Sequence, residues 1–291
     1  MKKIIILMPV FNDWESVNKL LKEINLVIQT IKDFKFECLI VNDCSTVKRT
    51  NFVKPDKFEK LEIINIKDNQ GHARCNALGL RYINFKKSFD YVIVMDSDGE
   101  DRPVEIKDLI EKISKEPNIS VVAKRVKRSE GIAFKTLYFI HKMITLIFAG
   151  KNINFGNYCC LTKSDINILI KNKSLWSSFS GSLKKHLSKL NEVNSTRGLR
   201  YFGPSKMSLL NLILHSFSII AVFKYAVLLR SFLICILLWF LITPKINLIF
   251  VALTLIIIFN VLIFVVSTRE KEKSLKNSNE KILYIDEILQ H

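Results

Sequence analysis

An uncharged run of 23 residues, 246–268, is the feature of this 291-residue chain that most restricts its fold. Because an α-helix rises about 1.5 Å per residue, such a run spans the roughly 30 Å hydrocarbon core of a bilayer. The stretch 225–244 is almost as apolar and is interrupted only by Arg230, whose long side chain can reach lipid headgroups. The sequence therefore predicts a two-helix transmembrane hairpin over residues 225–268.

A hairpin returns the chain to the side from which it came, so the residues before and after it face one compartment. Cytoplasmic loops are enriched in Lys and Arg, and cations flank this hairpin at both ends. We expect an integral cytoplasmic (inner) membrane protein with a large domain over 1–205, an amphipathic juxtamembrane segment over 206–224, and a cytoplasmic tail over 269–291. The flanking cations are Lys206, Lys224, Arg230, Arg269, Lys271, Lys273 and Lys276.

The large domain alternates between two hydrophobic periods. Continuous runs rich in Ile and Val predict buried strands, and between them apolar residues recur at helical spacing. This order predicts an α/β domain with a mostly parallel sheet wrapped by helices. The expected strands cover 3–10, 36–42, 61–66, 91–95 and 120–123, and the expected helices 17–31, 73–80 and 104–113.

Two carboxylates, Asp96 and Asp98, follow directly after the predicted strand 91–95. Ligands of open α/β sheets bind beyond the carboxyl ends of the strands. Two carboxylates at this spacing suit a divalent cation that also binds phosphate oxygens. An isolated Asp-x-Asp is also common in polar turns, so the pair gains weight only from its neighbours in the chain. The simplest chemistry is Mg²⁺ or Mn²⁺ holding a nucleotide diphosphate.

The net charge of +17 is large, but the sequence has no basic-aromatic recognition module, so no nucleic-acid partner is expected. Attraction to anionic lipid and to phosphorylated substrates explains the charge. The six cysteines lack paired metal-ligand spacing, which indicates a reducing compartment. The histidines lack it too and receive no chemical role: His72, His141, His186, His215 and His291.

Four motifs occur in order along the chain. Residues 8–13 read M-P-V-F-N-D, residues 41–45 V-N-D-C-S, residues 95–105 M-D-S-D-G-E-D-R-P-V-E, and residues 200–206 R-Y-F-G-P-S-K. They resemble the first-strand exit, the V-D-D-G-S stretch, the M-D-x-D-L-Q-D-P-P-E stretch and the R-x-x-G-x-S-K element of family 2 glycosyltransferases. The likeness is strongest to polyprenyl-phosphate glycosyltransferases, including dolichyl-phosphate mannose synthase-like enzymes.

The resemblance implies a GT-A-like nucleotide-sugar-binding domain that performs a metal-dependent, inverting transfer. The implied donor is a UDP- or GDP-linked sugar, and the implied acceptor is polyprenyl phosphate at the cytoplasmic membrane face. Membrane lipid is a further expected partner, and a homo-oligomer is one option. Two alternatives stay open: a transferase acting on a saccharide or lipid hydroxyl in cell-envelope polysaccharide assembly, and a catalytically inactive membrane scaffold.

Matching positions give the donor and metal residues that the resemblance implies. The donor-binding residues are Pro9, Asn12, Asp43, Gly71 and Asp96, and the metal ligands are Asp96, Asp98 and Glu100. Pro9 and Asn12 would shape the nucleobase pocket, and Asp43 would accept a hydrogen bond from the base. Alternatively, Asn12 is a helix N-cap, Asp43 a turn residue and Gly71 a loop glycine. Glu100 replaces a glutamine and either joins the metal or points to solvent.

The implied acceptor-phosphate residues are Arg125, Arg128, Lys135, Arg200, Ser205 and Lys206. The three arginines, with Asp96 and Asp98, form the implied catalytic set, since guanidinium groups present a fork of donors to phosphate. Lys206 is almost equally well explained as an interfacial anchor. Asp165 is expected in the first turn of a helix, so no general base is evident downstream of Asp101. That favours an ionised phosphate acceptor over a hydroxyl.

Departures from the family pattern weaken the donor and acceptor assignments. Cys44 replaces a glycine, so the turn after the second strand is expected to differ in backbone shape. Residues 158–161 replace an F-R-L stretch and remove a cation near the acceptor region. Two further apolar stretches, 134–148 and 207–223, fit interfacial helices that cradle a prenyl chain, and the first fits a core helix equally well.

Overall fold

The computed structural model describes residues 1–51, 53–127, 132–204, 208–241 and 246–289. Its first elements are β1 (Lys2–Val10), α1 (Trp14–Ile28), β2 (Phe34–Asn42), β3 (Phe58–Ile66), α2 (His72–Lys86), β4 (Tyr91–Val94), η1 (Pro103–Glu105), α3 (Ile106–Lys115) and β5 (Val121–Lys127). The following elements are α4 (Ile132–Ile144), the π-helical turn η2 (Thr145–Ala149), β6 (Phe155–Thr162), α5 (Lys163–Leu169), η3 (Lys173–Trp176), α6 (Phe179–His186) and β7 (Asn191–Thr196). The last are α7 (Leu209–Ala221), α8 (Lys224–Leu241), α9 (Ile246–Ser267), α10 (Glu272–Lys276), η4 (Ser278–Lys281) and β8 (Ile282–Glu287).

The described strands form one eight-stranded mixed sheet in the order β7-β5-β6-β4-β1-β2-β3-β8. β1 pairs in parallel with β2 and β4, β2 with β3, and β5 with β7. β6 is antiparallel to β4 and β5, and β8 is antiparallel to β3. The parallel centre agrees with the sequence prediction. The strand predicted at 120–123 does not neighbour β4, because the unpredicted β6 lies between them.

Alternate residues of β1 face two different helical layers. Ile4, Ile6 and Met8 pack in one buried cluster with α1 and α3, whereas Ile5 and Leu7 pack in a second cluster with α2, α5 and α6. Period-2 alternation of apolar side chains thus fills both faces of the sheet. The two layers hold the central strands rigidly, and their carboxyl ends carry the polar motifs.

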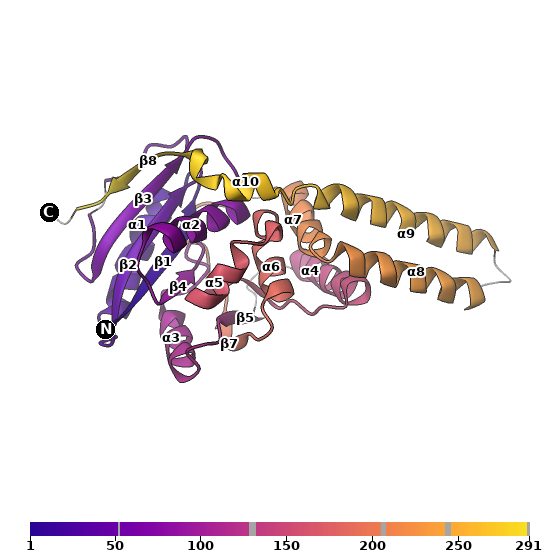
Figure 1. The fold of residues 1–291 in the computed structure, drawn as a ribbon, viewed down its shortest axis with the longest axis horizontal. Helices are drawn as coiled ribbons and strands as arrows, with labels where there is room; N and C mark the ends of the chain where they lie inside the picture. The colour runs from indigo at the N-terminus through magenta and orange to yellow at the C-terminus, as the bar shows by residue number, and fades with distance from the viewer. Residues whose placement is uncertain (52, 128–131, 205–207, 242–245, 290–291) are drawn as a thin grey trace.

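The last strand, β8, lies within the segment 269–291 that was expected to form a cytoplasmic tail. It pairs with β3 from Ile66↔Ile282 to Glu62↔Glu287 and occupies the edge of the sheet. In Figure 1 the yellow C-terminal strand lies beside β3, far from the tips of α8 and α9. This strand was not predicted from the sequence. Strands buried on both faces were the ones predicted, whereas β8 lies at the sheet edge and leaves Leu283, Tyr284 and Ile285 exposed. The sheet therefore contains residues from both sides of the hairpin.

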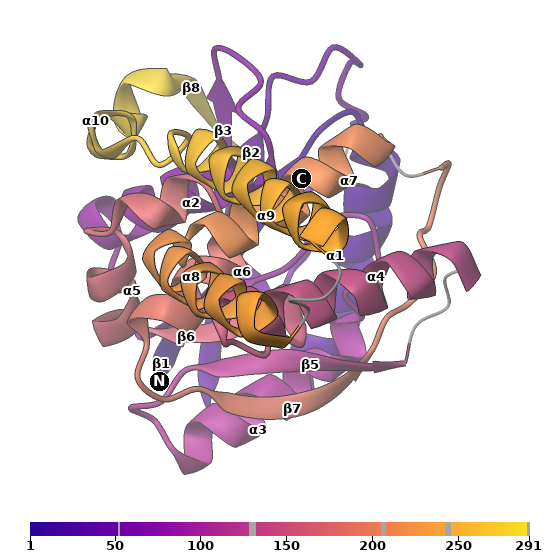
Figure 2. The ribbon, with the colours of Figure 1, turned by 90° about the vertical axis from the view of Figure 1, so that its right-hand side faces the viewer.

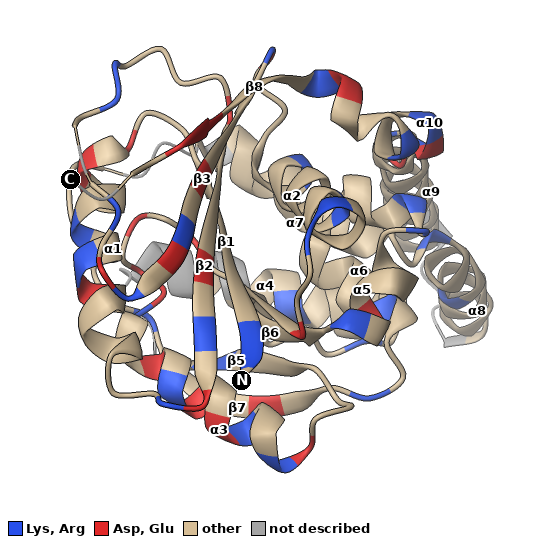
Figure 3. Cartoon of the chain, turned by 60° about the vertical axis from the view of Figure 1, so that its left-hand side comes forward, with Lys and Arg blue, Asp and Glu red and all other residues tan. Residues whose placement is uncertain are grey.

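Helices α8 and α9 leave the α/β domain together and lie side by side (Figures 1 and 2). Asn260 Nδ2 of α9 donates to Ser231 Oγ of α8 at 2.8 Å. Of the described helices, the segment Leu248–Lys276 is long and apolar enough to cross a membrane, and α7 with α8 qualifies only as a pair bent by 86°. Figure 3 shows few charged residues on α8 and α9.

Arg230 is exposed on α8, but its guanidinium also has a specific partner in η2. Its Nη1 donates to Ile147 O of η2 at 3.3 Å, and its guanidinium lies against Gly150. Gly150 has φ +65° and ends the π-helical turn. Arg230 therefore ties α8 to η2.

Candidate active site

Asp96 lies just beyond the carboxyl end of β4, where the sequence placed it. Its Oδ1 lies 2.7 Å from His72 Nε2 at the start of α2 and accepts from Asn157 Nδ2 of β6 at 3.3 Å. Its backbone N–H donates to Asp101 Oδ2 at 2.9 Å. Two elements from different parts of the chain, α2 and β6, thus contact this carboxylate, and Asp101 of the same loop holds its backbone.

Asp98 and Glu100 are each paired with an arginine that follows β7. Arg200 Nη1 lies 2.8 Å from Asp98 Oδ2, and its Nη2 contacts Asp13. Arg197 forms an ion pair with Glu100, so this side chain does not point freely to solvent. These pairs hold residues 96–101, here called the acidic loop, against residues 197–201.

Backbone contacts strengthen that attachment. Gly198 N donates to Glu100 O at 2.8 Å, and Tyr201 N donates to Asp98 O at 3.0 Å. Gly99 has φ +89°, and a Cβ there would collide with the Tyr201 ring. Glycine is therefore needed both for the turn and for the ring above it.

Arg125 of β5 acts on the acidic loop through its charge. Its guanidinium lies over Gly156 of β6, the residue before Asn157. Its charge helps to lower the pKa of Asp96. The structure therefore places the charges of Arg125 and Arg200 near Asp96 and Asp98, two of the three predicted metal ligands.

The carboxyl groups of the acidic loop differ in pKa. Burial alone would raise the pKa of Asp96, but His72, Arg125 and Arg197 bring it well below its usual range. The pKa of Asp98 is raised to about 6 by burial and by the charges of Asp96 and Glu100. Burial and Asp96 raise the pKa of Asp101 to about 7. Such a crowded acidic group is a setting in which an added cation is favourable.

On the predicted donor side, Asp43 organises the turn before α2. Its Oδ1 accepts from Gln70 N at 2.6 Å and its Oδ2 accepts from Gly71 N at 2.9 Å. Gly71 has φ +85°, and a Cβ added there would meet nothing within 4 Å, so its surroundings are open. Asp43, just beyond the end of β2, and Gly71, the N-cap of α2, therefore lie together.

Asn12 connects the exit of β1 with the loop after β2. Its Oδ1 accepts from Thr46 N at 2.8 Å and Val47 N at 3.0 Å, and its backbone N–H donates to Ser45 Oγ at 2.9 Å. The N-cap of α1 is Asp13 rather than Asn12. Pro9 lies in β1 opposite Val41. Cys44 has φ +57°, so it keeps a left-handed backbone at the position where glycine was expected.

The helix that precedes α8 lies close to the site. Burial and the nearby charges of His72, His141 and Arg125 lower the pKa of His215 of α7 to about 4. The other faces of α4, η2 and α7 leave apolar side chains exposed: Phe139, Ile140, Met143, Leu146, Ile147, Leu210 and Ile213. Since these side chains do not pack inside the domain, α4 is not the ordinary core helix that the sequence also allowed.

Some predicted residues lie outside this description. Arg128, Ser205 and Lys206 fall outside the described residues, as does the side chain of Lys135. Asp165 lies in the first turn of α5, as expected, and its carboxylate accepts from Ser120 Oγ. Because β6 is antiparallel to β4, Asp165 lies at the opposite end of the sheet from Asp96.

The sequence profile named Glycosyl transferase family 2 matches residues 5–179, more than half of the chain. The chain belongs to glycosyl transferase family 2. It is therefore a glycosyltransferase. No curated protein matches the sequence significantly.

Solved structures of other proteins share the fold. Glucosyl-3-phosphoglycerate synthase from Mycobacterium tuberculosis with Mn²⁺, UDP-glucose and phosphoglyceric acid is 14% identical, with TM-score 0.53, covering 78% of this chain and 80% of that one. Its complex with Mn²⁺, UDP and phosphoglyceric acid is 14% identical, with TM-score 0.51 and 78% of each chain covered. S. aureus TarS is 13% identical, with TM-score 0.46, covering 79% and 68%. The likeness to the synthase confirms the expected GT-A-like fold.

The acidic loop of this family 2 enzyme fits a divalent cation. Mg²⁺ commonly takes one or two carboxylates together with substrate phosphates, and Asp96 and Asp98 supply such a pair. Across the described ranges, no three His, Cys, Asp or Glu side chains are gathered as a ready-made metal cage. The nucleotide would therefore complete the coordination. The Mn²⁺ in the synthase complexes agrees with the expected Mg²⁺ or Mn²⁺ dependence.

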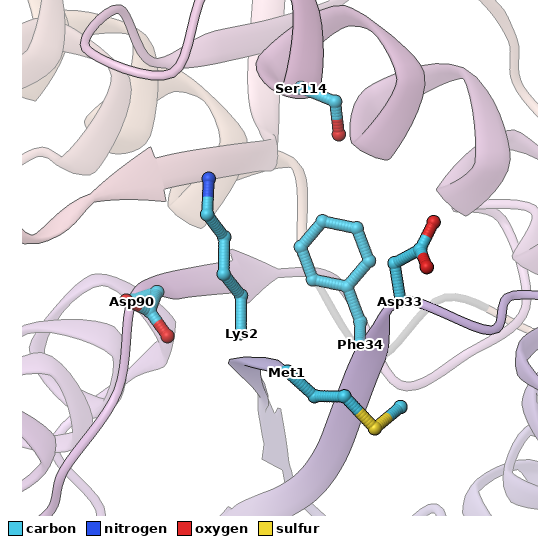
Figure 4. Close-up of a pocket in the computed structure, with 6 residues that line it drawn as sticks. All are labelled: Met1, Lys2, Asp33, Phe34, Asp90 and Ser114. Carbon is cyan, nitrogen blue, oxygen red and sulfur yellow. The ribbon is translucent and has the colours of Figure 1, made fainter.

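A depression of about 500 Å³ opens at the other end of the glycosyltransferase domain. Met1, Lys2, Asp33, Phe34, Asp90 and Ser114 line it (Figure 4). It lies where β1, β2 and β4 begin, opposite the strand ends that carry Asp96. It contains none of the predicted site residues.

Sequence reasoning missed three residues that contact the acidic loop, His72, Asn157 and Arg197, and also Asp13, which contacts Arg200. His72 follows Gly71 directly, and Arg197 lies three residues before Arg200, so both were close to predicted residues. Asn157 carried no signal, because β6 was not predicted. Their roles depend on contacts between distant segments.

Proposed function

We propose that this glycosyltransferase is metal-dependent and inverting, and that it transfers a sugar from a nucleotide diphosphate to polyprenyl phosphate at the cytoplasmic membrane face. One observation carries the proposal. Asp96 and Asp98 gather with Arg125 and Arg200 at the end of β4, close to α7, which precedes the apolar pair α8 and α9.

The donor would lie across the ends of β1, β2 and β4. Asp96 and Asp98, with Glu100 beside them, would hold Mg²⁺ or Mn²⁺, and Pro9, Asn12, Asp43 and Gly71 would border the nucleotide. The bound ion supplies positive charge where the diphosphate leaves. His72 and Asn157 keep the Asp96 carboxylate in one orientation. UDP- or GDP-linked sugars are the proposed donors.

A phosphate acceptor explains the surroundings of the acidic loop better than a hydroxyl acceptor does. A hydroxyl needs a positioned base to take its proton, whereas a phosphate is already ionised at neutral pH. Asp165 is excluded as that base by its place at the far end of the sheet. Arg125 and Arg200 present guanidinium forks that suit phosphate, and Arg128, Lys135, Ser205 and Lys206 are the further proposed acceptor contacts.

The membrane assignment rests on the two apolar helices and their flanks. Side chains of α8 and α9 such as Phe240, Leu255 and Ile257 are exposed, which is unfavourable in water and favourable in lipid. Because β8 returns to the sheet, both ends of the pair belong to the α/β domain, as a hairpin crossing from one side requires. The exposed apolar faces of α4 and α7 would rest in the headgroup region.

A transfer assay tests this function directly. Membranes containing the protein are incubated with radiolabelled UDP- and GDP-sugars, polyprenyl phosphate and Mn²⁺, and label is counted in the organic extract. We expect lipid-linked label from at least one donor, lost in Asp98→Asn and kept in Glu111→Gln, which changes an exposed carboxylate on α3. Label that enters only water-soluble or polymeric saccharide would contradict the phosphate acceptor and favour a hydroxyl.

A further inference from the structure

The C-terminal strand β8 supplies a carboxylate to the predicted donor end of the sheet. Asp286 lies opposite Ile63 in the β8/β3 ladder. Its Oδ2 accepts from Arg49 Nη1 at 2.9 Å and from Asn65 Nδ2 at 3.4 Å. Arg49 lies in the chain between β2 and β3, so Asp286 connects a residue after the hairpin with two residues far before it.

A line of amide side chains continues from Asp286 across the strand ends. Asn65 Oδ1 of β3 accepts from Asn42 Nδ2 of β2 at 2.8 Å. Asn42 Oδ1 then accepts from the backbone N–H of Ser45 at 3.0 Å. Ser45 Oγ in turn accepts from the backbone N–H of Asn12 at 2.9 Å. The line ends at two loops that contain the predicted donor residues Asn12 and Asp43.

Two groups fix the direction of this line: the carboxylate of Asp286 at one end and the backbone N–H of Ser45, which can only donate, at the other. An ionised carboxylate only accepts hydrogen bonds, so Asn65 must turn its NH₂ group towards it. The Asn65 carbonyl oxygen then faces Asn42, whose own oxygen is left to accept from Ser45. Asn65 is 7% exposed, so water does not readily substitute for a misdirected partner. A side chain that can also donate at position 286 would favour the opposite orientation of Asn65, and if Asn42 turned with it, the Ser45 backbone N–H would lose its acceptor.

We propose that Asp286 is a positioning residue for nucleotide-sugar binding, acting through Asn65 and Asn42 on loop 43–47. The inference rests on the proposed function in taking that loop as the donor end. It gives the strand after the hairpin a task in catalysis besides closing the edge of the sheet. Because one oriented amide relay is involved, the expected loss is about one net hydrogen bond.

The test compares Asp286→Asn and Asp286→Ala with Glu287→Gln in the full-length protein in detergent. Glu287 is the matched control because it lies in the same strand and pairs instead with Lys60 at 3.0 Å. Hydrogen exchange of the amides of residues 45–47 reports the loop without any ligand. Binding of UDP with Mn²⁺, and the KM for the sugar donor, report the donor end.

We expect faster exchange at residues 45–47 and about tenfold weaker UDP binding in both Asp286 variants, with kcat unchanged. Glu287→Gln should match the wild type in every measurement. Unchanged exchange in Asp286→Asn, or a loss in kcat with donor KM unchanged, would overturn the inference. If the wild-type protein binds no nucleotide, the proposed function fails, and the exchange measurement still decides whether Asp286 orders the loop.

Discussion

Arg200 Nη1 lies 2.8 Å from Asp98 Oδ2, although 102 residues separate the two in the chain. The same guanidinium also contacts Asp13 after β1. One side chain from the segment before the apolar helices thus connects the acidic loop with the start of α1. This contact explains why the proposed donor and acceptor regions belong to one site.

Replacing Arg200 with Ala should lower kcat/KM for lipid transfer by about 100-fold, the usual effect of removing one charged donor from a reacting centre. The KM for the lipid phosphate should rise more than the Kd for UDP. Arg102→Ala is the matched control, since Arg102 is near the same loop but is more exposed and faces Glu105 at 3.9 Å. Equal losses for both ligands would contradict an acceptor role.

Replacing Lys87 with Met should destabilise the domain by about 3 kcal/mol, because two buried carboxylates would lose their shared cation. Lys87 Nζ lies 3.0 Å from Glu37 and also contacts Glu62. Chemical denaturation in detergent measures the change. Lys115→Met, which breaks an exposed pair with Glu111, should change stability by less than about 0.5 kcal/mol. A similar loss in both variants would refute the assignment.

The ion pairs of Glu37 in this cluster should make the stability of the domain depend on pH. Burial raises the pKa of Glu37, but hydrogen bonds from Lys3 and Lys87 outweigh it and lower the pKa below the ordinary 4.5. A carboxylate with a lowered folded pKa stabilises the protein above its unfolded pKa and loses this effect as pH falls through the folded value. The melting temperature of Glu37→Gln should therefore fall less than that of the wild type when pH drops from about 6 to about 4. Parallel curves would count against this explanation.

Gly150→Ala should destabilise the contact between η2 and α8 more than backbone strain alone predicts. Gly150 has φ +65° and its Cβ position is occupied by the Arg230 guanidinium, whereas Gly203 has φ +64° with nothing nearby. Both substitutions carry a left-handed strain of about 1 kcal/mol, and only Gly150→Ala also displaces Arg230. Thermal unfolding of the two variants should differ accordingly. Equal shifts would mean that the Arg230 contact contributes nothing measurable.

The parts of the fold that the sequence predicted are those with a recognisable local pattern of apolar residues. β1, β2 and β4 were found because strands buried on both faces are continuous apolar runs. β6 was missed because Gly156, Asn157 and two cysteines interrupt such a run, and its position depends on pairing with β4 and β5. β8 was missed because it lies at the sheet edge with four of its six residues exposed.

The predicted parts of the site follow the same logic. Asp96 and Asp98 were found because they end a recognisable strand, and Arg125 and Arg200 because they match family motifs. His72, Asn157 and Asp13 acquire their contacts only when α2, β6 and the exit of β1 meet in space. The spacing of residues along the chain does not predict these contacts between distant segments, so only the tertiary structure could identify them.

Calorimetric titration of UDP with and without Mn²⁺ tests the central claim that Asp96 and Asp98 hold a cation beneath the donor diphosphate. We expect Mn²⁺-dependent binding to the wild-type protein and to Asp108→Asn, which changes an exposed α3 carboxylate. We expect no Mn²⁺-dependent binding to Asp98→Asn, with an unchanged melting temperature. Mn²⁺-dependent binding of wild-type strength in Asp98→Asn would contradict the claim.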